Sequence, residues 1–440
     1  MRKLALLVAT VVSVVSVATA DLKFAVVTNT VTGTGALDFT SSGFGTPKAV
    51  IFTATTGGAS DTEASNARWC YGFTDGVTNV CRTGTIRDGR PSATVKDMSL
   101  DNTCMMIPTI NGGTVQTSGV FSNWVTDGVR LDITAAGGTP LVVATMFGGA
   151  DLANAVADEI VTSLSNAVNT TRSVVMRDTF QPNLVFMAGS YEDFENTGRA
   201  DSFMSFGWAV DASGGIQQAG YSEYADHGVT TGRDARSMMV SGTYLWPVVG
   251  DEVDSEDYEL TAFNSDGFDI TTRNENAGAS RWMIYLALKL NNANFWAGDF
   301  DTDSGTDDTI THTDPGFQPE FLMMISSDMD TIDTLEIDAN ANTVGLGATD
   351  GSFEWNACIV AEDNTGAGTD TASIVAPKVG YTRKLVGTAG ISASFDSFTA
   401  DGFRLTYSSV ESTVRKWLGL AIGEQSSAAQ ITYGGPVIVQ

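Results

Sequence analysis

The stretch Phe180-Gln-Pro182-Asn-Leu-Val-Phe-Met187 joins an aromatic residue and a proline to a short apolar run. Proline fixes φ and donates no hydrogen bond, so a sheet tolerates it at the first residue of a strand but not in the middle. We therefore predict that a buried strand begins here. The same opening occurs at two other places, Phe44-Gly-Thr-Pro47-Lys-Ala-Val-Ile-Phe52 and Phe317-Gln-Pro319-Glu-Phe-Leu-Met-Met324.

The three prolines are separated by 135 residues (47 to 182) and 137 residues (182 to 319), which indicates a repeat. Two further landmarks follow each opening. We interpret one as a glycine-centred hairpin: Tyr71-Gly72-Phe-Thr-Asp75-Gly76, Phe206-Gly207-Trp-Ala-Val-Asp211 and Leu346-Gly347-Ala-Thr-Asp350-Gly351. The other is a short apolar run after a polar loop: Cys104-Met-Met-Ile107, Ser237-Met-Met-Val240 and Arg383-Lys-Leu-Val386.

The fourth landmark is an aromatic residue three positions before an Asp-Gly pair. Glycine adopts positive φ at little cost and aspartate can bond the backbone of a turn, so the pair predicts a chain reversal between two strands. An apolar strand then closes each unit. The three copies are Trp124-Val-Thr-Asp127-Gly128-Val-Arg-Leu131, Phe263-Asn-Ser-Asp266-Gly267-Phe-Asp-Ile270 and Phe398-Thr-Ala-Asp401-Gly402-Phe-Arg-Leu405.

Four landmarks in one order predict three tandem homologous units, at residues 21–150, 151–291 and 292–425. The apolar segments are five to eight residues long, rich in β-branched and aromatic residues, and separated by turn residues. This pattern predicts an all-β fold in which each unit is an antiparallel β-sandwich, jelly-roll-like and about 135 residues long. One segment conflicts with it, because Asp151 to Leu164 has helical spacing. Its alignment with Asn294-Phe-Trp-Ala-Gly-Asp-Phe300 favours a strand.

The two ends and the charge limit the classes of protein. Residues 1–20 have a basic start, an apolar core and Ala18-Thr19-Ala20, so they form either a cleaved secretory signal or an anchoring segment. Residues 426–440 are a short tail. The net charge of −28 should repel nucleic acid and anionic membranes, so we expect neither as a partner.

The residues for common catalytic sites are scarce. The chain has two histidines, His227 and His312, at non-equivalent positions in different units, and we expect both in surface loops. It has no GxSxG elbow and no phosphate-binding loop. We therefore expect no enzymatic activity and no catalytic residues or organic cofactor. Cys70 and Cys81 flank a turn-like stretch and either face each other across a hairpin or remain free thiols.

Calcium is the one metal that the sequence suggests. Asp299, Asp301, Asp303 and Asp307 alternate near Gly305, and alternate carboxylates near a glycine can wrap an oxygen-seeking cation. The stretch departs from the helix–loop–helix calcium loop because the glycine is one place late and no glutamate ends it. A solvated acidic loop is the competing interpretation.

The openings GFGTPKAVIF at Gly43 and GFQPEFLMM at Gly316 resemble the "GFQPKAVIF" openings of uncharacterised bacteriophage virion structural proteins. The resemblance covers Asp21 to Gly423. It implies β-sandwich modules of a tail fibre, spike or capsid or tail decoration protein. It also implies an extracellular virion location, with other copies of the chain and other virion proteins as partners. A homo-oligomer is the expected arrangement, although three units in one chain could form a ring by themselves.

The alternative is a secreted bacterial cell-surface adhesin or glycan-binding repeat protein. The signal-like residues 1–20 favour it, and a host surface glycan would then be a partner. Four tryptophans lack clear counterparts in all three units, and they could stack on sugars or pack in cores. They are Trp208, Trp246, Trp296 and Trp355.

Overall fold

The computed structural model describes residues 21–56, 64–86, 96–109, 114–161, 168–190, 199–200, 202–225, 235–249, 254–275, 282–303, 308–337, 342–361, 371–385, 388–409 and 413–425. These residues form β-strands and turns and contain no helix, so the predicted all-β fold is confirmed. No helix in these ranges could span a membrane.

Within the described residues, eleven strands lie in each predicted unit. The first unit contains β1 (Lys23–Thr30), β2 (Gly35–Thr40), β3 (Pro47–Thr55), β4 (Ala64–Ser65), β5 (Ala67–Thr74), β6 (Asn79–Ile86), β7 (Lys96–Asp101), β8 (Met105–Pro108), β9 (Val115–Val125), β10 (Gly128–Ala136) and β11 (Leu141–Gly148). The second contains β12 (Leu152–Val161), β13 (Thr171–Val175), β14 (Leu184–Ser190), β15 (Arg199–Ala200), β16 (Ser202–Ala212), β17 (Gly215–Ala225), β18 (Ala235–Ser241), β19 (Trp246–Val249), β20 (Asp254–Asn264), β21 (Gly267–Glu275) and β22 (Trp282–Leu290). The third contains β23 (Ala293–Asp301), β24 (Thr309–His312), β25 (Phe321–Ser327), β26 (Glu336–Ile337), β27 (Asn342–Thr349), β28 (Glu354–Ala361), β29 (Thr371–Ala376), β30 (Gly380–Leu385), β31 (Thr388–Thr399), β32 (Gly402–Ser409) and β33 (Lys416–Glu424).

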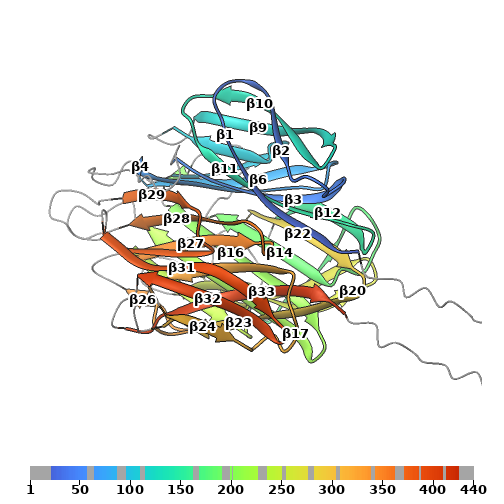
Figure 1. Ribbon diagram of the computed structural model, residues 1–440, viewed down its shortest axis with the longest axis vertical. Coiled ribbons are helices and arrows are strands. Elements are labelled where there is room, and N and C mark those ends of the chain that lie inside the picture. Colours follow the sequence, from blue (N-terminus) through green and yellow to red (C-terminus); the bar gives the residue numbers. More distant parts are fainter. Residues whose placement is uncertain are drawn as a thin grey trace, which may run out of the picture.

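One strand order occurs three times. The first unit forms a large sheet with the order β1-β11-β3-β5-β6-β7 and a four-stranded sheet with the order β2-β10-β9-β8, all antiparallel. The corresponding strands of the other two units, eleven and twenty-two places later, have the same neighbours. Figure 1 shows the resulting layers. The strand β12 lies within the segment Asp151 to Leu164, so the alignment gave the correct prediction and the helical spacing did not.

Each large sheet gains its seventh strand from the next unit. The two-residue strand β15 of the second unit pairs with β7 of the first, and β26 of the third pairs with β18 of the second. The strand β4 of the first unit pairs with β29 of the third, which closes the cycle. These pairings join the three units in a ring by backbone hydrogen bonds across sheet edges.

The starts of the units meet at one place. The Asp151 carboxylate accepts a hydrogen bond from the Asp21 backbone nitrogen at 2.6 Å and from the Asn292 side-chain amide at 2.9 Å. The Gln425 backbone nitrogen donates to the Asn292 carbonyl at 2.6 Å. The first and last described residues therefore lie at the same end of the molecule. In Figure 1 the coloured chain begins and ends at the right, whereas β4 and β26 lie at the left.

The large sheets are buried on both faces. Along β14, Leu184, Phe186 and Ala188 belong to a central core that the large sheets of all three units share. The alternate residues Val185 and Met187 pack instead against the four-stranded sheet of their own unit. Each unit is thus a sandwich, and three sandwiches enclose a common core. This arrangement explains why the strands after each proline are apolar throughout instead of alternating.

The glycine that we placed at the centre of a hairpin lies inside a strand. A Cβ built on Gly72 in β5 would lie 1.9 Å from the Cys104 carbonyl oxygen. The equivalent contacts are 1.9 Å from Gly207 to the Leu245 oxygen and 1.8 Å from Gly347 to the Val379 oxygen. The glycine recurs because the backbone just before β8, β19 or β30, which leads into the four-stranded sheet, lies directly against it and leaves no room for a Cβ.

These contacts also correct our third landmark. They show that Cys104, Leu245 and Val379 are equivalent, and the strand that follows each is β8, β19 or β30. Ser237–Val240 lies in β18, which corresponds to β7 and not to β8. The alignment was wrong because the Met-Met pairs that begin at Met105 and at Met238 look alike in sequence. The first lies in β8, whereas the second lies in β18, the equivalent of β7.

The Asp-Gly pairs do mark chain reversals, but of their three glycines only Gly267, with a φ of 157°, has the predicted positive φ. Positive φ falls on Asp127 at 62°, and Gly128 is not among the positive-φ residues. A Cβ on Gly128 would lie 1.9 Å from the Phe39 carbonyl oxygen of β2. The glycine is therefore required for close approach of the neighbouring strand.

Candidate functional site

Three of the four candidate calcium ligands lie in the described residues, and Lys416 forms ion pairs with two of them. Lys416 Nζ lies 2.7 Å from Asp301 Oδ1 and 3.4 Å from Asp299 Oδ2. The hydrogen bond that Lys416 donates to Asp301 is the main reason that the pKa of Lys416 is raised. Asp303 is half-buried, and Asp307 lies outside the described residues. The described ranges contain no group of three potential ligands, and calcium binding stays a prediction.

The prediction of a surface location is wrong for His312, and His227 lies outside the described residues. His312 ends β24 and is 7% exposed. Its ring stacks on Phe403 at 5.1 Å and contacts Phe300 at 4.6 Å. Burial among these rings lowers the pKa of His312 to about 4. The side chain acts as a neutral core residue at pH 7.

His312 should make the protein sensitive to acid. The unfolded chain takes up a proton at about pH 6.5 and the folded chain only at about pH 4, so falling pH in this window favours unfolding. We expect the His312→Phe variant to lose about 3 kcal/mol less free energy of unfolding than the wild type between pH 7 and pH 4. Denaturant titrations at both pH values measure this difference. Equal losses in both proteins would show that His312 is protonated in the folded state.

The cysteines and tryptophans have structural positions. Cys70, Cys81, Cys104 and Cys358 are buried and form no disulfide, and the strand register pairs Cys70 with Thr83 and not with Cys81 across the β5–β6 hairpin. Trp208, Trp246 and Trp296 are buried in cores, so packing is confirmed for them. Trp355 packs partly buried against the central core and also lines a cavity.

The contacts between units form a site that the sequence did not reveal. It is built on the turn between β5 and β6, where Asp75 Oδ1 accepts hydrogen bonds from the backbone nitrogens of Val77 and Thr78, both at 2.8 Å. The other oxygen, Oδ2, accepts a hydrogen bond at 2.8 Å from the backbone nitrogen of Ala157. Ala157 lies in β12, the edge strand of the next unit. Asp75 thus accepts a backbone hydrogen bond from the edge strand of the second unit's large sheet.

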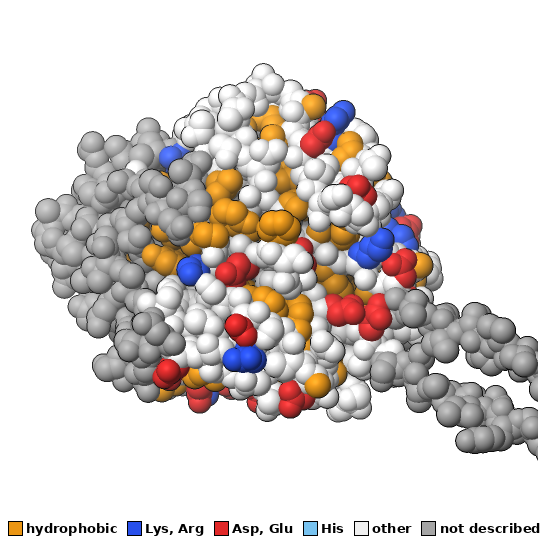
Figure 2. Space-filling model, viewed as in Figure 1, with side chains coloured by type: hydrophobic (Ala, Val, Ile, Leu, Met, Phe, Trp, Pro, Cys, Tyr) orange, Lys and Arg blue, Asp and Glu red, His pale blue; other side chains and the backbone are white. Residues whose placement is uncertain are grey.

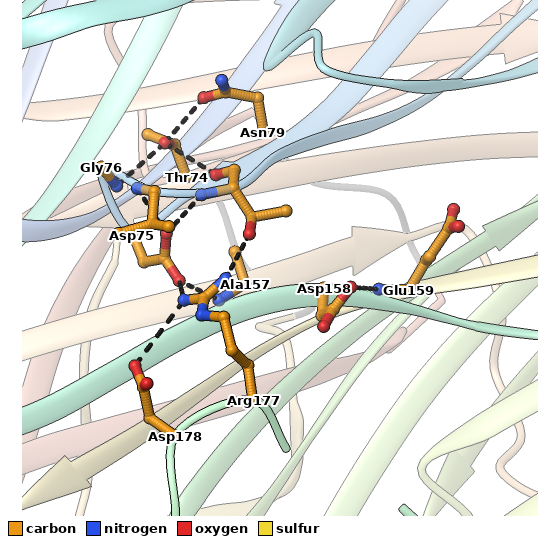
Figure 3. Close-up of polar contacts among 11 residues, drawn as sticks. Thr74, Asp75, Gly76, Asn79, Ala157, Asp158, Glu159, Arg177 and Asp178 are labelled. Atoms are coloured by element: carbon orange, nitrogen blue, oxygen red, sulfur yellow. Dashed lines mark hydrogen bonds and ion pairs between the residues drawn. The ribbon is translucent and has the colours of Figure 1, made fainter. Parts of the chain in front are cut away.

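Arg177 completes this site (Figure 3). Its guanidinium donates to Asp75 Oδ2 at 2.5 Å and to the Thr78 hydroxyl. The Asp75 side chain is 1% exposed and that of Arg177 is 31% exposed. Burial opposes the charge on Arg177, but the hydrogen bond and the charge of Asp75 outweigh it, so the pKa of Arg177 is raised. The pair joins the first and second units.

Removing the cation should leave a buried carboxylate without its countercharge. We expect Arg177→Met to lower the free energy of unfolding by about 1–3 kcal/mol. Combining it with Asp75→Asn should cost less than the sum of the two single changes. The matched control is Arg130→Met, whose ion pair with Asp38 is 38% and 41% exposed and should stabilise the fold less, because solvent screens it. Equal losses for Arg177→Met and Arg130→Met would contradict a special role for the inter-unit pair.

The contact between the third and first units repeats the turn. Asp350 Oδ1 accepts hydrogen bonds from Ser352 and Phe353, both at 2.8 Å, and Oδ2 accepts one from the Val26 backbone nitrogen of β1 at 3.0 Å. Between the second and third units, Gln217 Oε1 accepts from the Ala297 backbone nitrogen of β23 at 2.9 Å. All three edge strands are capped from a neighbouring unit.

A cavity of about 820 Å³ opens beside Asp350. The first unit contributes Phe24 and Ser42 among others, and the third contributes Glu320, Phe353 and Trp355. Phe353 is 59% exposed. Figure 2 shows hydrophobic side chains gathered in a band across this face, between the upper part built by the first unit and the lower part built by the third.

A second cavity, of about 450 Å³, lies at the equivalent place between the second and third units. Asp211 at the end of β16 and Ser213 in the turn after it line the cavity from one side, and Phe295 and Pro315 line it from the other. At the remaining boundary, between the first and second units, Arg177 lies against the turn that contains Asp75 and Thr78. The sequence could have suggested Asp75 and Asp350 from their shared Thr-Asp-Gly, but nothing in it pointed to Arg177.

A buried carboxyl elsewhere has an altered pKa without forming a site. Glu223 in β17 is 3% exposed, and burial raises its pKa to about 8. The Tyr221 hydroxyl donates to it at 3.2 Å. Glu223 lines neither of the two cavities, so we interpret it as a neutral core residue at pH 7.

Comparison with known proteins adds no relative, because no family model and no curated sequence matches this chain.

Proposed function

We propose that the protein is a non-enzymatic structural component of a bacteriophage virion, a tail fibre, spike or decoration protein. The observation that carries the proposal is the cyclic exchange of β15, β26 and β4 among the three units. It suits a protein that must keep its shape outside a cell, because no unit can separate without breaking sheet pairings at two of its edges. The resemblance of the proline openings to phage virion proteins supports the same role.

The two ends of the molecule suit an appendage. The unit starts meet around Asp151 at one end, and the exchanged strands β4 and β26 lie at the other. In the proposed role the first end attaches to other virion proteins and the second faces outward. Three units in one chain supply a threefold arrangement that separate chains would otherwise have to assemble.

Two measurements on the same native sample test this role. They are the intact mass of the protein and mass spectrometry of purified virions. We expect a chain that begins at Met1 in the particles, at a fixed ratio to the capsid protein. A chain that begins at Asp21 and is absent from particles would contradict the proposal and favour a secreted surface adhesin.

A further inference from the structure

The cavity between the third and first units has a filled counterpart. Its turn, at Asp350, makes the same hydrogen bonds as the turn at Asp75, including the one to the edge strand of the next unit. At Asp75 a guanidinium from Arg177 occupies the space beside the carboxylate. The protein therefore contains its own example of the group that such a site accepts.

The strand registers identify the residue that replaces Arg177. Thr40 pairs with Gly128, and Val175 pairs with Gly267. The next residue in each unit donates its backbone nitrogen to the Asp of the Asp-Gly pair, at 2.9 Å from Ser41 and at 3.0 Å from Met176. One step further on, Ser42 corresponds to Arg177. Its short side chain lines the cavity and leaves it open.

The cavity walls suit a planar cation. Phe353 stands where Thr78 binds the Arg177 guanidinium, and its ring is largely exposed. Trp355 and Phe24 line the same space. Guanidinium groups stack on aromatic faces and pair with carboxylates, whereas the compact, strongly hydrated ammonium of lysine does so less well. The replacement of a hydroxyl by an aromatic ring preserves a surface for the cation.

The charges of the cavity are compatible with this ligand. Asp350 and Glu320 line it, and burial raises the pKa of Glu320, with the charge of Glu424 adding to the effect. Lys23 is the opposing charge, and its Nζ is directed to the Gly43 carbonyl oxygen at 3.4 Å. Asp350 Oδ2, beside the Val26 nitrogen, is the atom that corresponds to the acceptor of Arg177.

We propose that this cavity is a receptor for the guanidinium group of an arginine on a partner protein. A volume of about 820 Å³ exceeds what one arginine side chain fills, so flanking residues of the partner segment would enter as well. The guanidinium would bind Asp350 as Arg177 binds Asp75 and would stack on Phe353. The site depends on local geometry and does not require the virion role.

Calorimetry on the full-length protein tests this with three blocked peptides, acetyl-Gly-Arg-Gly-amide and its citrulline and lysine analogues. We expect the arginine peptide to saturate one site and to bind at least tenfold more tightly than the citrulline analogue, which keeps the shape and lacks the charge. The lysine peptide should fall between them. Equal binding of the arginine and citrulline peptides, or no binding of the arginine peptide at millimolar concentration, would overturn the proposal.

Variants locate the binding. Ser42→Arg should place a guanidinium in the cavity from within and abolish binding, whereas Thr32→Arg adds the same charge at an exposed position outside it and should not. Asp350→Asn should weaken binding at least tenfold, and Ser42→Arg keeps the test decisive if that variant does not fold. Unchanged binding in Ser42→Arg would refute the location. Binding of free arginine amide as tight as that of the peptide would refute a partner segment as the ligand.

Discussion

The Gly347→Ala variant is expected to lose more than about 3 kcal/mol of unfolding free energy, or to fail to fold. The added Cβ would lie 1.8 Å from the Val379 carbonyl oxygen and 2.8 Å from Asn356 Nδ2. The first is a backbone atom at the crossing to the four-stranded sheet and has no rotamer by which to move away. The strand or the crossing must shift, and the sandwich core beneath them shifts with it.

The matched control is Gly33→Ala. Gly33 is exposed, and nothing lies within 4 Å of the position of its Cβ. Alanine there should leave stability unchanged or raise it slightly, because it restricts the unfolded chain. Thermal and denaturant unfolding of both variants measures the contrast. A Gly347→Ala protein as stable as the control would show that the crossing is loosely packed.

This glycine shows what the sequence could and could not predict. Its recurrence at Gly72, Gly207 and Gly347 was visible, and so was the repeat that it marks. Its role was not, because the atoms that it must avoid belong to residues 32 to 38 positions later. Local chemistry predicts a turn for a glycine near Asp-Gly, whereas the structure uses the glycine to bring two distant segments together.

The strands were predictable because their signals are local. A proline before an apolar run, and alternation such as Phe403, Leu405 and Tyr407 on one face, depend on neighbouring residues. The exchanged strands were not predictable. Arg199–Ala200 and Glu336–Ile337 are two residues long, and each pairs with a strand of another unit. Pairings of this kind depend on how the units are placed in space, which composition and periodicity do not encode.

The candidate site divides in the same way. Asp75 and Asp350 stand out as repeated turn residues, but the chemistry of their turns depends on the residue beside them. Arg177 is 102 positions from Asp75, and Ser42 takes its place in the first unit. The acidic run at Asp299 was conspicuous in sequence, yet Lys416 on the adjacent strand β33 neutralises part of it. When the residues of a site come from different units, each stretch of sequence contains only one of them, so the sequence does not show that they lie together.

The Phe147→Ala variant is expected to lose about 3–5 kcal/mol of unfolding free energy. Phe147 is fully buried in the central core, with its ring 5.7 Å from Phe186 of the second unit and 5.6 Å from Phe321 of the third. Removing the ring leaves a cavity where the three units meet, and the rigid sheets around it can collapse only in part. The substitution should therefore weaken the packing between the units as well as the packing within the first unit.

Phe353→Ala is the matched control, because it removes the same ring from a position that is 59% exposed and should change stability by less than about 0.5 kcal/mol. Hydrogen exchange of the Phe147→Ala protein should then report where the core loosens. We expect faster exchange in strands of all three large sheets, including β14 and β25, since Phe186 and Phe321 lose a packing partner. Faster exchange confined to β1–β11 would mean that the units are independent sandwiches in contact, and that the central core does not bind them into one body.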